Sequence, residues 1–252
     1  MEKKNNDSVK KEEKRAVISS SGDLMEYDEH ISITGSAKIS GGKVKKSIRI
    51  SGSGGINGDL ECDGLTSSGT LKGSGNLIAH GDISSSGSLN IAGSVRGEGS
   101  ADFSGSTQIG NLVRIQGALV ASGSFKVGHF VTVDEGIEIS GSSSINGNIS
   151  AQKSIKIDGS TKIEGNAVAE NVLLGASEET RKKQHYRIHG SILAKNIVDV
   201  NRTHVDGDIK GKDVRIGRGA EILGTVYYVD KIEVDKKAKL AKEPTQIELH
   251  EL

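Results

Sequence analysis

The chain has 252 residues, with 33 basic and 33 acidic side chains, 34 glycines, 3% aromatic residues, one proline and no tryptophan. The balanced charge removes the general electrostatic argument for a nucleic-acid partner, and the scarcity of bulky side chains excludes a thick two-layer core. Any core must therefore be narrow. The lone cysteine, Cys62, excludes an intramolecular disulfide and a cysteine-rich zinc site, and we expect it to be a small core residue.

The N-terminal segment, residues 1–17, mixes Lys, Glu and Asn without hydrophobic periodicity. Such a composition predicts a disordered, charged tail. The segment lacks the apolar stretch of a signal peptide, and no run of 18 apolar residues occurs in the chain. We therefore expect a cytoplasmic protein without direct membrane insertion.

A glycine recurs every six residues through the middle of the chain. Of the 17 positions met at this step from Gly69 to Gly165, 13 are glycine. A longer period overlies the first one, because glycine-centred triplets recur at steps of 17 and then 18 residues from Gly35 to Gly159. Steps of 17 residues resume at 190, 207 and 224. A regular internal period of this length is typical of a solenoid.

Within one six-residue unit, such as "GSLNIA" at 87–92, aliphatic residues alternate with polar residues. This alternation predicts a strand with one buried face. Three units make a coil of 17–18 residues with a triangular cross-section, and stacked coils bury a shared interior. Glycine is expected at the corners, either because they need a positive φ or because backbones crowd there. The sequence thus predicts an all-β fold, a single-stranded parallel β-helix over residues 18–240.

Two segments interrupt or follow this pattern. Residues 176–186 form a charged cluster that we interpret as an insertion at one corner, either a partner contact or a simple loop. Residues 241–252 are predicted to be a C-terminal tail.

No motif for catalysis, cofactor or metal binding is recognisable. The chain lacks a phosphate-binding loop and a dinucleotide fingerprint, and its seven histidines share no position in the repeat. His129 occupies a glycine position, where we expect a structural role at a corner. We therefore predict no enzyme activity, no cofactor, no metal, and no catalytic residue.

The alternative is a β-helical enzyme such as a hexapeptide-type acyltransferase, or a carbohydrate-binding surface. Against the transferase, glycine here lies two positions after the buried aliphatic residue, whereas in those enzymes the small residue follows it directly.

The segment "VDGDIKGKDVRIGRGAEILG" at 205–224 resembles the bactofilin family of bacterial cytoskeletal proteins. The matching residues are Val205, Gly207, Asp208, Ile209, Gly211, Val214, Ile216, Gly219, Ala220, Ile222 and Gly224. The resemblance implies a right-handed triangular β-helix with disordered termini. It also implies end-to-end assembly, without nucleotide, into filaments that support cell shape, envelope or motility assembly. The implied partners are further copies of the chain, another bactofilin, or an envelope or motility protein. The implied location is the cytoplasm, with the inner face of the membrane as a peripheral alternative.

The ends of such a rod are the candidate assembly interface, because the last coil of a β-helix carries unpaired N–H and C=O groups. The residues predicted to lie there are Ile31 and Ile33 in the first coil and Ile232, Val234 and Leu240 in the last. Residues 235–244 are rich in Lys and end in Pro, which is typical of a protected edge. For the C-terminal end, a cap and an interface therefore both remain open.

Overall fold

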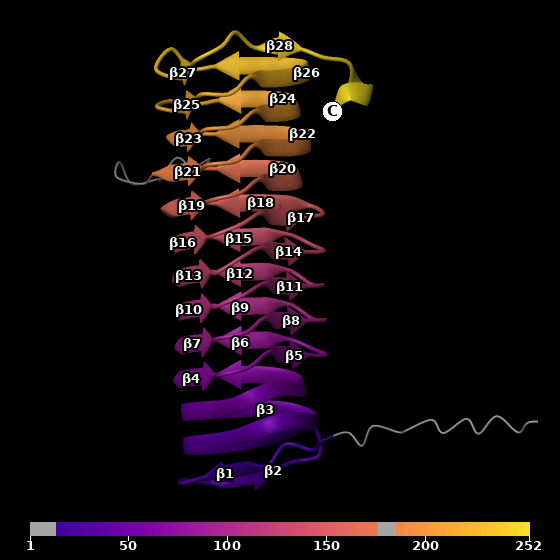
Figure 1. The fold of residues 1–252 in the computed structure, drawn as a ribbon, viewed down its shortest axis with the longest axis vertical. Helices are drawn as coiled ribbons and strands as arrows, with labels where there is room; N and C mark the ends of the chain where they lie inside the picture. Colours follow the sequence, from indigo (N-terminus) through magenta and orange to yellow (C-terminus); the bar gives the residue numbers. More distant parts are fainter. Residues whose placement is uncertain (1–13, 176–184) are drawn as a thin grey trace, which may run out of the picture.

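The computed structural model describes residues 14–175 and 185–252, which form a parallel β-solenoid of about 10 turns (Figure 1). The predicted all-β parallel β-helix is confirmed. Each turn consists of three short strands, and each strand pairs in parallel with the strand one turn later, as β4 does with β7 and β7 with β10. The rod therefore has three faces. The described residues contain no α-helix and one short 3-10 helix, η1 (Leu249–Glu251).

The strands of each face are defined by these pairings. The first face holds β4 (Thr70–Gly73), β7 (Ser88–Ile91), β10 (Ser106–Ile109), β13 (Ser124–Val127), β16 (Ser142–Ile145), β19 (Thr161–Ile163), β21 (Tyr186–Ile188), β23 (Thr203–Val205), β25 (Glu221–Ile222) and β27 (Lys239–Leu240). The second face holds β5 (Leu77–Ala79), β8 (Val95–Gly97), β11 (Val113–Ile115), β14 (Val131–Val133), β17 (Ile149–Ala151) and β28 (Thr245–Gln246). The third face holds β6 (Ile83–Ser85), β9 (Ala101–Phe103), β12 (Leu119–Ala121), β15 (Ile137–Ile139) and β18 (Ser154–Ile157). Four longer strands bend from the second face into the third: β20 (Ala167–Leu174), β22 (Ile192–Val200), β24 (Ile209–Ile216) and β26 (Val226–Val234).

The N-terminal turns are built differently. One long strand, β3 (His30–Ser67), winds around all three faces and pairs with β4, β5 and β6. Before it, β1 (Ile18–Ser20) and β2 (Leu24–Glu26) lie antiparallel to β3. The parallel solenoid therefore ends, on this side, in a short antiparallel layer (Figure 1).

The interior is a column of aliphatic side chains that follows the predicted alternation. In β15, for example, Ile137 and Ile139 are buried while Glu138 between them is exposed. Cys62 is fully buried in the same column, as predicted. The alternation works because successive side chains of a strand point to opposite faces, so every second residue enters the bore.

The rod accommodates its few buried aromatic residues by placing small residues directly above and below them. Phe103 stacks between Ser85 and Ala121 in its ladder. Phe125 lies between Thr107 and Ser143, and Tyr186 lies between Thr161 and Thr203. Hydrogen bonding fixes the spacing between strands at ~4.8 Å. A large ring therefore fits only where the side chains at the same position in the adjacent turns are small.

Crowding of the backbone, and not positive φ, explains the glycines from Gly52 to Gly159 at the corner between the third and first faces. A Cβ atom on Gly105 would lie 1.8 Å from the carbonyl oxygen of Gly87 one turn below, and one on Gly123 would lie 1.9 Å from that of Gly105. Neither residue has a positive φ, which among the described glycines occurs only at Gly35, Gly42, Gly58, Gly175 and Gly219. At Gly35, Gly175 and Gly219 of the same corner φ is positive, so both explanations that the sequence left open apply, each in different turns.

The corner between the first and second faces carries a ladder of polar side chains that the sequence analysis missed. The backbone N–H of Ser94 donates to Oδ1 of Asn76 one turn below (2.8 Å), and the N–H of Asn166 donates likewise to Oδ1 of Asn148 (2.8 Å). Each of these residues follows a corner glycine, so the signal was a Gly followed by Asn, Asp, Ser or Thr. The ladder satisfies backbone donors where the strand pairing is interrupted.

The two interruptions of the pattern lie at defined places. Residues 1–13 of the predicted tail and residues 176–184 of the predicted insertion lie outside the described residues. The insertion joins β20, which ends at Leu174, to β21, which begins at Tyr186 and so includes one residue of the predicted insertion. At the C-terminus, the segment predicted as a tail instead contributes β28, which pairs with β26, and η1.

Candidate functional site at the ends of the rod

The C-terminal end of the rod is an open turn. Its outermost strands are β27, β28 and the second half of β26, and no described strand pairs with their outer edges. Ile232 and Leu240 pack against the core while remaining half-exposed, and Val234 is 43% exposed. All three residues that the sequence placed at this end therefore lie in the last turn and keep apolar surface in contact with solvent.

Charged side chains surround this apolar surface. The Lys231 ammonium pairs with the Glu233 carboxylate at 2.6 Å, on the outward side of β26. Lys236, Lys237 and Lys239 are exposed on the segment that leads into β27. Because no carboxylate ion pair is made by these three lysines within the described residues, they retain positive charge beside the open edge.

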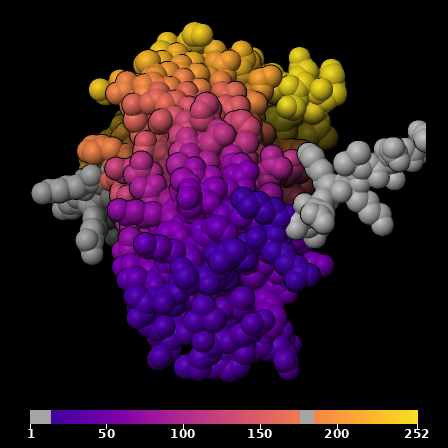
Figure 2. All heavy atoms as spheres, turned by 60° about the horizontal axis from the view of Figure 1, so that its bottom comes forward, coloured from indigo at the N-terminus to yellow at the C-terminus, as the bar shows by residue number. Residues whose placement is uncertain are grey.

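The N-terminal end differs from the C-terminal end. Ile33 is fully buried and Ile31 half-buried, because β2 pairs with their strand, Leu24 opposite Ile33 and Glu26 opposite Ile31. The structure thus places the two predicted interface residues one layer below the outer edge. Figure 2, which turns this end forward, shows a surface formed by the indigo and violet atoms of the N-terminal turns.

The exposed apolar surface at this end belongs to the antiparallel layer instead. Val17, Leu24, Met25 and Tyr27 are 69%, 42%, 48% and 47% exposed. Both ends therefore present apolar side chains beside strand edges, but only the C-terminal end does so with the residues predicted from the sequence.

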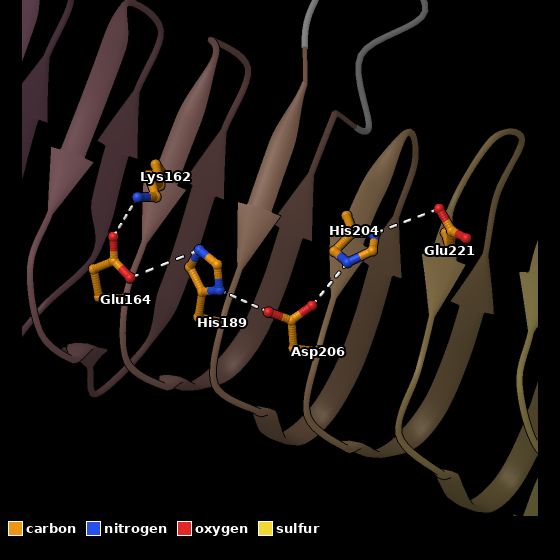
Figure 3. Close-up of polar contacts among 6 residues, drawn as sticks. All are labelled: Lys162, Glu164, His189, His204, Asp206 and Glu221. Carbon is orange, nitrogen blue, oxygen red and sulfur yellow. Dashed lines mark hydrogen bonds and ion pairs between the residues drawn. The ribbon is translucent and has the colours of Figure 1, made fainter.

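A long row of titratable side chains lies on the outer surface of the turns on either side of the insertion (Figure 3). His189 Nδ1 lies 2.6 Å from Asp206 Oδ2, and His204 Nε2 lies 2.7 Å from Asp206 Oδ1. Glu164 and Glu221 extend the row on either side, at 3.7 Å from His189 and 3.4 Å from His204. The sequence analysis missed this cluster. Its signal was the 17-residue step from His189 to Asp206, one turn of the solenoid.

The electrostatics of this row are those of paired charges. Burial tends to raise the pKa of Asp206, but the hydrogen bonds from His189 and His204 outweigh it and hold that pKa below its ordinary value. The hydrogen bond from Lys162 lowers the pKa of Glu164. An imidazole donates from both nitrogens only when it is protonated. With both histidines in that form, positive imidazoles alternate along the row with the negative carboxylates of Glu164, Asp206 and Glu221. Such a row holds neighbouring turns in register.

Three further observations concern residue types that often carry catalysis. They contain no group of three or more His, Cys, Asp or Glu side chains that could hold a metal ion. Burial raises the pKa of the Cys62 thiol to about 12, so this thiol is not a reactive nucleophile. His129 lies at a corner, as expected, and is exposed there.

Comparisons with known proteins do not place the chain in a family: no family model, curated protein or solved structure matches it. The class that the fold defines is a three-sided parallel β-solenoid. In the described part of the chain, we find no helix that is long and apolar enough to cross a bilayer.

Proposed function

We propose that the chain is a bactofilin-like structural protein that assembles end to end into filaments without nucleotide. The observation that carries the proposal is the open C-terminal turn, where Ile232, Val234 and Leu240 lie beside unpaired strand edges. Stacking a second rod on this turn pairs the free backbone groups and removes apolar surface from water, at about 25 cal/mol per Å². Edge pairing of this kind fixes the axis of growth along the rod.

The antiparallel layer at the other end supplies the second contact. Its exposed Leu24 and Met25 offer apolar area next to the free edge of β2. Because this layer is antiparallel and the C-terminal turn is parallel, the two ends are chemically different surfaces. In a filament, either the C-terminal end of one rod contacts the N-terminal end of the next, or C-terminal ends contact each other and N-terminal ends contact each other.

In this proposal the chain acts as a scaffold and not as an enzyme. Its partners are further copies of itself or another bactofilin, and a protein of the envelope or motility machinery that the filament positions. Its location is the cytoplasm or the inner face of the membrane.

Sedimentation and negative-stain microscopy of the purified chain test the proposal. We expect filaments that pellet equally with ATP, with GTP or with EDTA. Val234→Arg is expected to keep the β-sheet signal in circular dichroism and to lose pelleting, because it places a charge in the open turn. The matched control is Val120→Arg, since Val120 is 39% exposed on the third face at mid-rod.

A second pair of variants examines the N-terminal end. Leu24→Arg changes an exposed residue and is expected to stop growth with the fold intact, whereas Ile33→Arg changes a fully buried residue and is expected to unfold the first turn. A chain that stays monomeric at all concentrations, or a Val234→Arg variant that pellets as the parent does, contradicts end-to-end assembly through these surfaces.

A further inference from the structure

The polar ladder at the corner between the first and second faces is broken in two adjacent turns. At this corner the usual pair is glycine followed by a polar residue, as in Gly75–Asn76 and Gly147–Asn148. In the two broken turns the pairs are Asn111–Leu112 and His129–Phe130. The backbone pairing continues through these turns, since the N–H of Val113 still donates to the carbonyl of Phe130 (3.0 Å). The fold therefore does not require the apolar side chains.

A shallow hollow of about 560 Å³ lies on the second face at the same place. Its walls include Arg96, Arg114, Leu112, Phe130, Gln116 and Thr132. Phe130 is 46% exposed, a large apolar exposure for a residue whose counterparts outside these two turns, such as Asn76 and Asn148, are polar. The volume falls within the range of small-ligand sites.

Two unneutralised positive charges stand side by side in this hollow. Arg96 of β8 and Arg114 of β11 are direct neighbours in the parallel ladder. Like charges opposite each other in a sheet are destabilising. Glu98 also lines the hollow, but its carboxylate faces His80 at 3.1 Å. In the part of the chain that the structure describes, neither arginine forms an ion pair with a carboxylate.

We propose that this hollow binds an acidic carbohydrate. The guanidinium groups of Arg96 and Arg114 match a carboxylate or phosphate in geometry and charge. The Phe130 ring supplies an apolar surface for one face of the sugar ring. The Gln116 amide and the Thr132 hydroxyl supply donors and acceptors for ring hydroxyls.

The site is independent of the proposed assembly. It lies on the side of the rod, in turns formed by β8, β11 and β14, far from both ends (Figure 1). End-to-end stacking leaves it accessible. Failure of carbohydrate binding would therefore leave the assembly proposal standing, and the reverse also holds.

Isothermal titration calorimetry of the full chain tests the inference, with galacturonate and polygalacturonate as probes and galactose as the neutral control. We expect binding of the acidic probes that weakens with added salt, and none of galactose. Binding of the monosaccharide identifies a sugar acid as sufficient, whereas binding of the polymer alone identifies an acidic polysaccharide that spans several turns. Arg96→Gln/Arg114→Gln is expected to weaken binding at least tenfold. Arg49→Gln/Arg187→Gln removes the same charge from two exposed arginines elsewhere and is expected to leave binding unchanged.

A repeat-restoring variant separates binding from folding. Leu112→Asn/Phe130→Asn returns the corner to the residue type found at 76, 148 and 166. We expect it to keep or raise the thermal stability, because each new amide oxygen can accept an N–H from the next turn, and to abolish binding. The inference is overturned if neither acidic probe binds, if both arginine double variants bind equally, or if the repeat-restoring variant unfolds the rod.

Discussion

At the scale of single residues, the rod is governed by how closely consecutive turns approach. Gly105 has no room for a Cβ atom because the Gly87 carbonyl lies directly beneath it. The buried residues obey the same constraint, since Ser85 and Thr107 lie next to phenylalanines. Their hydroxyl groups have no hydrogen-bond partner within the described residues, so their small volume is what the position requires.

The glycine ladder yields a prediction. Gly105→Ala is expected to lower the free energy of unfolding by about 1–3 kcal/mol or more, because the new methyl group would overlap backbone that cannot move without displacing a turn. Gly55→Ala is the control, since its nearest neighbour, the Ala37 carbonyl oxygen, would lie 4.0 Å from the new Cβ atom. That variant is expected to change stability by less than about 0.5 kcal/mol. Urea unfolding followed by circular dichroism measures both, and equal shifts would contradict the steric explanation.

At the scale of elements, the number of residues at a corner varies between turns while the strands beside it stay paired in parallel. The corner between the third and first faces contains three residues between β18 and β19, but two between β22 and β23, namely Asn201 and Arg202. The strands on either side stay in parallel register through both corners. The number of residues at a corner can therefore change without disturbing the fold, because the strands fix the pairing between turns and each added loop residue costs little closure entropy.

The insertion gives the prediction at this scale. Deleting residues 177–185 leaves Gly175 and Ala176 between β20 and β21, which is the length of the corner at Asn201–Arg202 in the next turn. We expect the β-sheet signal and the unfolding midpoint to stay close to those of the parent chain. Thermal melting by circular dichroism checks this, and loss of the β-sheet signal would show that the segment belongs to the fold.

At the scale of the whole molecule, the solenoid is nearly one-dimensional. Apart from the C-terminal segment, where Lys210 Nζ donates to the Glu251 carbonyl oxygen more than one turn away, each turn packs on the turns above and below it, so stability is a sum of turns and interfaces between them. The two terminal surfaces are the exception, and they differ: β1 and β2 cover the first turn, while the last turn remains open. Self-association through strand edges is therefore expected at the two ends, which offer different surfaces to a second rod.

A whole-turn deletion tests this additivity. Removing residues 142–159, which comprise β16, β17 and β18, joins Gly141 to Ser160 and stacks β19 directly on β13. The deletion keeps the alternation and places the small Thr161 next to Phe125. We therefore expect a folded, shorter rod with a modestly lower unfolding midpoint. Removing only residues 142–150 shifts the alternation by an odd number and turns buried side chains outward. That variant is expected not to fold, and comparable melting curves for the two deletions would contradict additive stacking.

The sequence by itself determined the repeat length, the alternation and hence the parallel β-helix, because these depend on local spacing that any stacked turn must share. It also placed Ile232, Val234 and Leu240 correctly in the last turn. The burial of Cys62 and the corner location of His129 followed from their phase in the repeat, whereas the exposure of His129 did not.

Only the tertiary structure decided what depends on contacts between turns. The antiparallel course of β1 and β2, which buries Ile33, cannot be read from a segment that lacks the repeat. The pairing of His189 with Asp206 joins residues one turn apart, and the pairing of Glu164 with His189 joins residues on either side of the insertion, which obscures their phase. The hollow at Arg114 and Phe130 exists because side chains from consecutive turns stand side by side, a relation that appears only once the register between turns is fixed.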